Sequence, residues 1–87
     1  MKPKDILKGQ FLKVVDNQLQ ENKPPETAQT LQRLKDEGYS EKDAKLLIAQ
    51  CVALEIFEVM KSNQPFNKER YVHNLNRLPE TPSEENE

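Results

Sequence analysis

Few residues of this 87-residue chain have the type and spacing that catalysis or metal binding requires. The single cysteine, Cys51, lies in the most apolar stretch, whereas a reactive thiol needs partial exposure and positively charged neighbours. The single histidine, His73, is expected to be exposed and has no second histidine or cysteine at metal-ligand spacing. The carboxylate pairs Asp36–Glu37 and Glu84–Glu85 lie in polar stretches, as solvated charges do. We therefore predict a buried structural cysteine, no catalytic residue, no metal site and no cofactor.

The elements that would position these residues are helices, because apolar residues recur at helical spacing in four segments. No segment shows the alternation of a half-buried strand. We predict helices at about 4–21, 25–37, 41–62 and 67–78, so that residues 1–78 form a single all-α domain, a compact four-helix bundle. The remaining segment, 79–87, is acidic and contains proline, and we predict a disordered tail.

The predicted helix ends carry residues suited to those positions. Pro25 fits the first turn of the second helix, and Gly38 can adopt the left-handed conformation that ends it. Ser40 and Asn67 are predicted N-caps of the third and fourth helices. Before the fourth helix, the pair Phe66–Tyr71 has the spacing of a hydrophobic staple.

The third predicted helix is the most apolar. From Ala44 to Met60, apolar residues outnumber polar ones by about three to one, and the polar residues do not gather on one face. Such a helix must be covered on several sides, so we predict that it lies at the centre of the bundle. Because one short chain leaves part of it uncovered, we also predict a two-fold homodimer. The candidates for core or dimer contacts are Leu46, Ile56, Phe57 and Met60.

Composition narrows the classes of function. Hydrophobic residues make up 34% and charged residues 32% of the chain, with a net charge of −2 and a pI near 5.5. This charge balance argues against nucleic-acid binding, which needs clustered lysine and arginine. The longest apolar stretch is too short and too charged to span a membrane. One cysteine excludes an internal disulfide and fits a reducing compartment, so we expect a cytoplasmic protein.

The turn between the second and third predicted helices permits two further interpretations. The segment from Leu31 to Ala44, with E-G-Y-S at its centre, is similar to the L-x-x-M-G-F/Y loop of ubiquitin-associated domains. That similarity implies a peptide- or ubiquitin-binding module in which Gly38 and Tyr39 contact the ligand. A helix-loop-helix turn explains the same residues without any ligand. A DNA-reading helix-turn-helix is excluded, because the helix that follows is mainly apolar.

Three sequence blocks resemble a family of small, uncharacterised bacterial helical proteins. They are D-N-Q-L-Q-E-N-K-P-P-E-T (16–27), the run from L-x-x-L and E-G-Y-S to E-I-F-E-V-M (31–60), and Q-P-F-N-K-E-R-Y-V (64–72). Their order and spacing match over most of the chain, from about residue 8 to residue 79. The resemblance implies a helical fold and names no established activity.

Many members of that family carry the patterns H-x-x-x-H-x-x-x-E and H-E-A-x-H on their first and third helices. Facing pairs of this kind could hold a metal inside a bundle. The matching positions in this chain, none of them a histidine, are Lys8, Leu12, Asp16, Lys42, Asp43 and Leu46. We therefore expect a non-catalytic protein that self-associates or binds another protein. The alternatives are a degenerate metal-binding or hydrolytic protein and the ubiquitin-associated-like module.

Overall fold

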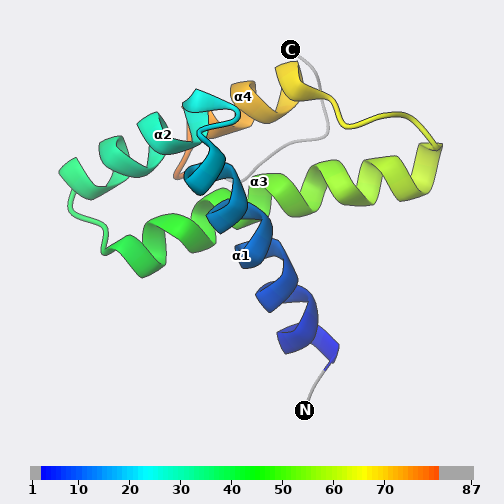
Figure 1. Ribbon diagram of the computed structural model, residues 1–87, viewed down its shortest axis with the longest axis horizontal. Helices are drawn as coiled ribbons and strands as arrows, with labels where there is room; N and C mark the ends of the chain where they lie inside the picture. The colour runs from blue at the N-terminus through cyan, green and yellow to red at the C-terminus, as the bar shows by residue number, and fades with distance from the viewer. Residues whose placement is uncertain (1–2, 81–87) are drawn as a thin grey trace.

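The chain forms a bundle of four helices, seen in a computed structural model that describes residues 3–80 and the side chains from Gly9 onward (Figure 1). The helices are α1 (Pro3–Glu21), α2 (Pro25–Asp36), α3 (Glu41–Ser62) and α4 (Lys68–Arg77). The predicted all-α fold is confirmed, and each predicted helix end lies within one residue of the observed end. Of the predicted tail, Pro79 and Glu80 are exposed, and 81–87 lie outside the described residues.

Helix α3 lies at the centre, because it packs against each of the other three helices. Helix α1 crosses it obliquely, while α2 and α4 lie together along another side (Figure 1). Its buried residues occur between Ala44 and Glu55. Beyond Glu55, α3 has no further buried residue, and there Phe57 and Met60 are exposed. The predicted central position is therefore confirmed for the first two thirds of α3.

The core joins side chains from all four helices. Val15 of α1 and Leu34 of α2 are fully buried beside Ile48 of α3 and Leu75 of α4. Tyr71 of α4 is the largest side chain that is completely inaccessible to solvent. Burial of such side chains stabilises the fold by about 1.5–3 kcal/mol each, which is how a small domain compensates the entropy lost on folding.

The predicted helix caps are present. Ser40 Oγ accepts a hydrogen bond of 3.1 Å from the backbone N–H of Asp43. Asn67 Oδ1 accepts one of 3.0 Å from the N–H of Arg70. Gly38 has a φ of 107° after the last turn of α2, which glycine adopts without a steric penalty. The rings of Phe66 and Tyr71 meet edge to face at 5.4 Å, as a hydrophobic staple does.

Two helices end at asparagines in the left-handed conformation. Asn22 and Asn63, the residues that follow α1 and α3, have left-handed φ values of 55° and 57°. Asparagine is second only to glycine in this conformation. The N–H of Asn63 donates to the carbonyl of Val59 at 2.9 Å and so closes the last turn of α3.

An arginine of α2 holds the C-terminal end of α4. Arg33 Nη2 donates to the carbonyl of Leu75 at 2.9 Å, and Nη1 donates to the carbonyl of Leu78 at 3.1 Å. The last carbonyls of a helix lack the usual partner four residues on, so these bonds supply donors to two carbonyls at this helix end. Arg33 also forms an ion pair of 2.9 Å with Glu37, which keeps the guanidinium in place.

Replacing Gly9 by alanine is expected to raise the free energy of unfolding by about 0.5–1 kcal/mol. Gly9 lies within α1, is exposed, and a Cβ built there meets no atom within 4 Å. Alanine therefore adds helix propensity without a clash. Urea denaturation followed by circular dichroism measures the change. The control is Gly38→Ala, which should lower stability because its φ of 107° strains any residue with a Cβ. An unchanged or lower midpoint for Gly9→Ala would contradict the helical assignment at Gly9.

Candidate functional site

The four apolar residues predicted to make core or dimer contacts occupy different environments. Ile56 is partly buried and packs against the core. Leu46 is also partly buried, near the start of α3. Phe57 is 52% exposed and Met60 is 76% exposed. Within one subunit, therefore, Ile56 is a core contact, whereas Phe57 and Met60 are open to contact from outside.

Phe57 and Met60 lie on the same side of α3 as Ala53 and Leu54, and these four residues are here called the α3 apolar face. These residues are three or four positions apart, so they share one side of the helix. Ala53 and Leu54 are partly exposed. The ring of Phe57 meets the edge of the Phe11 ring of α1 with centroids 6.1 Å apart, which orients the exposed aromatic side chain. This face can bind a second apolar surface.

Cys51 is fully buried, as predicted. Burial, together with the nearby carboxylate of Glu55, raises the pKa of its thiol from 9.0 to about 12. The thiolate is the form that attacks substrates or binds metals, and at neutral pH this position disfavours it. Cys51 is therefore suited to packing rather than to chemistry.

The largest departure from the prediction is a buried ion pair between α3 and α4. Glu55, one of the few polar residues in the apolar stretch of α3, has no exposed surface. Its Oε2 accepts a hydrogen bond of 2.6 Å from Arg70 Nε, and its Oε1 accepts one of 2.9 Å from Arg70 Nη2. Two parallel bonds of this kind fix both the distance and the orientation of the two helices.

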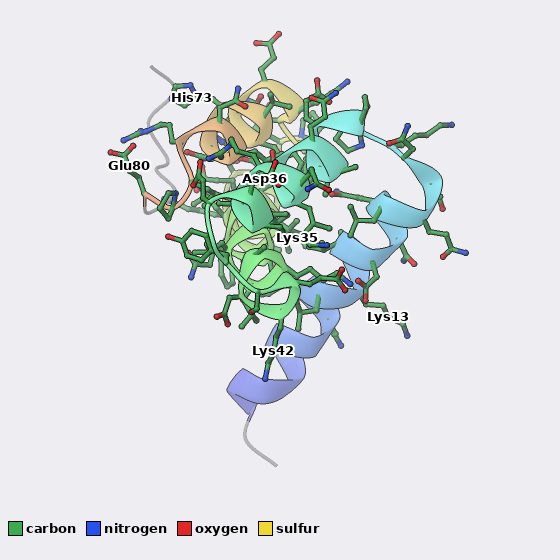
Figure 2. All side chains as sticks on the ribbon, turned by 90° about the vertical axis from the view of Figure 1, so that its left-hand side faces the viewer. Lys13, Lys35, Asp36, Lys42, His73 and Glu80 are labelled. Atoms are coloured by element: carbon green, nitrogen blue, oxygen red, sulfur yellow. The ribbon has the colours of Figure 1, made fainter. Side chains whose placement is uncertain are left out.

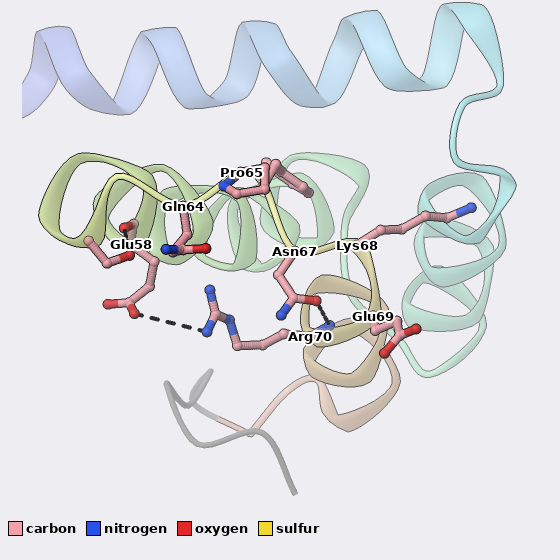
Figure 3. A pocket seen from close by; sticks show the side chains of 9 residues that line it. Glu58, Gln64, Pro65, Asn67, Lys68, Glu69 and Arg70 are labelled. Atoms are coloured by element: carbon pink, nitrogen blue, oxygen red, sulfur yellow. Dashed lines mark hydrogen bonds and ion pairs between the residues drawn. The ribbon is translucent and has the colours of Figure 1, made fainter.

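The same carboxylate also holds the start of α4. Glu55 Oε1 accepts a hydrogen bond of 3.1 Å from the backbone N–H of Asn67, the N-cap of α4. On the outer side, Glu58 Oε1 lies 3.9 Å from Arg70 Nη1 (Figure 3). Beside Arg70 the surface forms an open hollow of about 640 Å³, walled by the loop from Gln64 to Asn67 (Figure 3). The hollow contains carboxylates and cations in balance, which is typical of a structural ion-pair cluster.

A signal for this ion pair was present in the sequence. Glu55 follows Ile48 by seven positions and Val52 by three, so it lies on the core stripe of α3. A carboxylate on a core stripe requires a cationic partner, because an unpaired buried charge is very costly. Arg70 is the third residue of α4, directly after the loop that follows α3. The pattern thus identifies Glu55 as a residue needing a partner, although it does not select the partner.

A second buried polar cluster joins α1, α2 and α4. The hydroxyl of Thr27 donates to Gln18 Oε1 at 2.8 Å, and the hydroxyl of Tyr71 donates to the same oxygen at 2.7 Å. The two hydroxyl oxygens lie 3.0 Å apart. Burial raises the pKa of Tyr71 from 10.0 to about 12. The cluster stays neutral at neutral pH and fixes the side chain of Gln18 from two directions.

Of the positions that match the histidine patterns of the resembled family, Asp16 forms an ion pair where α1 packs on α3. Asp16 Oδ1 of α1 lies 2.9 Å from Lys45 Nζ of α3, and Glu41 lies 3.8 Å from the same ammonium. The hydrogen bond to Asp16 is the main cause of a raised Lys45 pKa. The ammonium of Lys45 therefore lies between the carboxylates of Asp16 and Glu41. Among the other matching positions, Leu12 and Leu46 are partly buried, and Lys42 and Asp43 are exposed. The side chain of Lys8 lies outside the described residues.

The remaining candidate groups lie apart from one another. His73 is partly covered, rather than exposed as predicted, and lies at the outer edge of α4, away from Lys42 (Figure 2). Asp36 and Glu37 are exposed, as expected, and Glu84–Glu85 lies outside the described residues. No group of three histidine, cysteine or acidic side chains suited to a metal ion occurs within the described part of the chain.

The turn that resembles the ubiquitin-associated loop has a structural explanation. Gly38 is exposed, but the ring of Tyr39 is partly buried and packs against the core. The N–H of Tyr39 donates to the carbonyl of Leu34 at 3.0 Å, which is part of the helix-ending arrangement. The aromatic ring is thus engaged with its own subunit.

Among the helices of residues 3–80, none is long and apolar enough to cross a membrane. Comparison with family models, curated proteins and solved structures found no match to this chain. The function has to be argued from the surfaces described above.

Proposed function

We propose that this protein is a non-catalytic interaction module that self-associates, with the α3 apolar face as its contact surface. The observation that carries the proposal is the exposure of two large apolar side chains one turn apart, Phe57 at 52% and Met60 at 76%. They lie in the last turns of α3, after Glu55, the last buried residue of that helix. Apolar surface of this kind gains free energy when a partner removes it from water.

A second copy of the chain fits this face. If two α3 helices pack antiparallel about a two-fold axis at Phe57, Leu54 of one copy lies opposite Met60 of the other. None of the four residues of the face is charged, so this pairing buries no unmatched charge. Lys61, at the edge, can lay its aliphatic stem over the contact and keep its ammonium in water. A contact of about three helical turns is small, so we expect a weak, reversible dimer.

The non-catalytic part of the proposal is supported by the state of the reactive groups. The Cys51 thiol is buried, and burial raises its pKa to about 12. The carboxylate of Glu55 is occupied by Arg70 and by a backbone N–H. Lys45 fills the place between Asp16 and Glu41. A free, buried cysteine is also compatible with the reducing cytoplasm, where we propose that the protein acts.

Replacing Met60 by glutamate is expected to abolish self-association, because the two-fold contact would then bury a carboxylate from each copy. Sedimentation velocity over a wide range of concentration, up to high micromolar values, measures the effect. The unmodified chain should change from monomer to dimer over this range, and Met60→Glu should remain monomeric. Met60 is 76% exposed, so the variant should fold with little loss of stability.

The matched control is Gln29→Glu, which introduces the same charge at an exposed position of α2. It should dimerise like the unmodified chain. A monomer at every concentration for the unmodified chain would refute self-association. Equal dimerisation of Met60→Glu and the unmodified chain would refute the assignment of the contact to the α3 apolar face.

A further inference from the structure

A groove separate from the α3 apolar face lies between the end of α1, the α1–α2 turn and the loop that precedes α4. It is an open hollow of about 590 Å³, here called the Phe66 groove. Its lining residues are Val14, Gln18, Lys23, Pro24, Pro25, Phe66 and Lys68. The volume lies within the range of sites that bind small ligands or single peptide side chains.

The apolar part of the groove is rigid. Pro24 and Pro25 have a fixed φ angle, so this wall loses little entropy when a ligand binds. The ring of Phe66 is 41% exposed and rests edge to face on the buried ring of Tyr71 at 5.4 Å. An exposed aromatic ring supported from beneath, beside prolines, offers a preformed contact for an apolar side chain.

The polar part of the groove offers hydrogen-bond donors. Gln18 Oε1 is held by the hydroxyls of Thr27 and Tyr71, so the side-chain amide has a fixed orientation. Its Nε2 makes no hydrogen bond with the described part of the chain. A fixed amide donor in a groove suits a carbonyl or carboxylate oxygen of a ligand.

The charged side chains that line the groove favour a ligand with negative charge. Lys23 and Lys68 are exposed, and Lys68 extends towards the α1–α2 turn (Figure 3). Neither ammonium forms an ion pair with the residues that the structure describes. No carboxylate is among the lining residues, whereas the hollow beside Arg70 contains Glu58 and Glu69. The lining of the Phe66 groove therefore holds two positive and no negative side chains, while Lys68 also borders a neighbouring hollow that contains Glu26 and Glu69.

We propose that the Phe66 groove binds a partner's peptide segment in which an apolar side chain is flanked by acidic residues. The apolar side chain packs on Phe66 and the two prolines, a backbone carbonyl accepts a hydrogen bond from Gln18, and the flanking carboxylates lie beside Lys23 and Lys68. Two lysines are too few for the phosphate backbone of a nucleic acid, and the apolar floor is unsuited to a small inorganic anion.

The test is an NMR titration of the isotope-labelled full chain with synthetic peptides. The probes carry leucine, phenylalanine or tryptophan at the centre of a glutamate-rich segment, and the matched peptides replace glutamate by lysine. At least one acidic probe should shift the backbone amides of Lys23, Phe66 and Lys68, and its binding should weaken as salt is added. The lysine peptides should leave these signals unchanged.

Substitutions test whether the acidic peptide binds in the Phe66 groove. The double variant Lys23→Glu/Lys68→Glu should weaken binding of the acidic probe by about tenfold or more, because it reverses both charges. The control Lys42→Glu changes an exposed lysine on α3 outside the groove and should bind normally. Met60→Glu should also bind normally, which separates this proposal from self-association. The proposal is overturned if no acidic probe shifts the groove signals, if lysine peptides bind equally well, or if a single-stranded oligonucleotide shifts them more strongly.

Discussion

The variant Glu55→Gln is expected to lose about 3–5 kcal/mol of folding free energy, the largest effect of any single polar substitution that we predict. The Glu55 side chain is completely buried, and that of Arg70 is only 13% exposed. Removing the carboxylate charge leaves a guanidinium with little access to water and weakens two charge-assisted hydrogen bonds. For a small domain with a total stability of about 5–15 kcal/mol, such a loss removes a large share of that stability. Urea denaturation measures it.

Two further variants test whether the loss of stability comes from the broken ion pair or from any substitution in α3. Glu58→Gln removes a carboxylate one turn further on, 3.9 Å from the same guanidinium, and should cost about 1 kcal/mol or less. The double variant Glu55→Met/Arg70→Met leaves no unpaired charge, so it should be more stable than Glu55→Gln alone. If Glu55→Gln cost no more than Glu58→Gln, the ion pair would not be a principal link between α3 and α4.

Alkaline pH is expected to produce the second large effect, through Cys51 and Tyr71. Burial raises the pKa of each group to about 12 in the folded chain, from 9.0 for the thiol and 10.0 for the phenol. Between pH 10.0 and about 12, the unfolded chain has largely released both protons, whereas the folded chain retains them. Stability is therefore complete below about pH 9 and declines as the pH rises towards about 12. Each group contributes a slope of about 1.4 kcal/mol per pH unit.

Urea denaturation at a series of alkaline pH values tests this dependence. Cys51→Ala and Tyr71→Phe each remove one of the two protons, so each should flatten the decline of stability with pH. Val52→Ala is the matched control, since it removes buried apolar atoms from the same core without a titratable group. It should lower stability by a similar amount at every pH. Parallel curves for all variants would show that neither buried group controls the alkaline loss.

The sequence was sufficient to predict the helices because their ends depend on local chemistry. Ser40, Asn67 and Gly38 act within one turn of the residues that they cap, so spacing along the chain identifies them. The staple of Phe66 and Tyr71 is equally local. The central position of α3 was also predictable from the sequence, because a helix that is apolar on most sides must be covered by the other helices.

The candidate sites were predictable only in part, because they depend on residues brought together across the fold. Glu55 and Arg70 are 15 positions apart, and Gln18 and Tyr71 are 53 apart. Helical spacing shows which face a residue occupies, but not which helix lies against that face. The exposure of Phe57 and Met60 likewise depends on where α1 crosses α3, which the sequence pattern does not specify.

The attachment of α4 at both ends has a consequence for the order of folding. A segment of 10 residues is too short to be a stable helix by itself in water. Its first turn is held by Glu55 of α3, and its last carbonyls are held by Arg33 of α2. The helix α4 therefore becomes stable only after α2 and α3 have come together. If α4 leaves the native bundle, the buried ring of Tyr71 enters water.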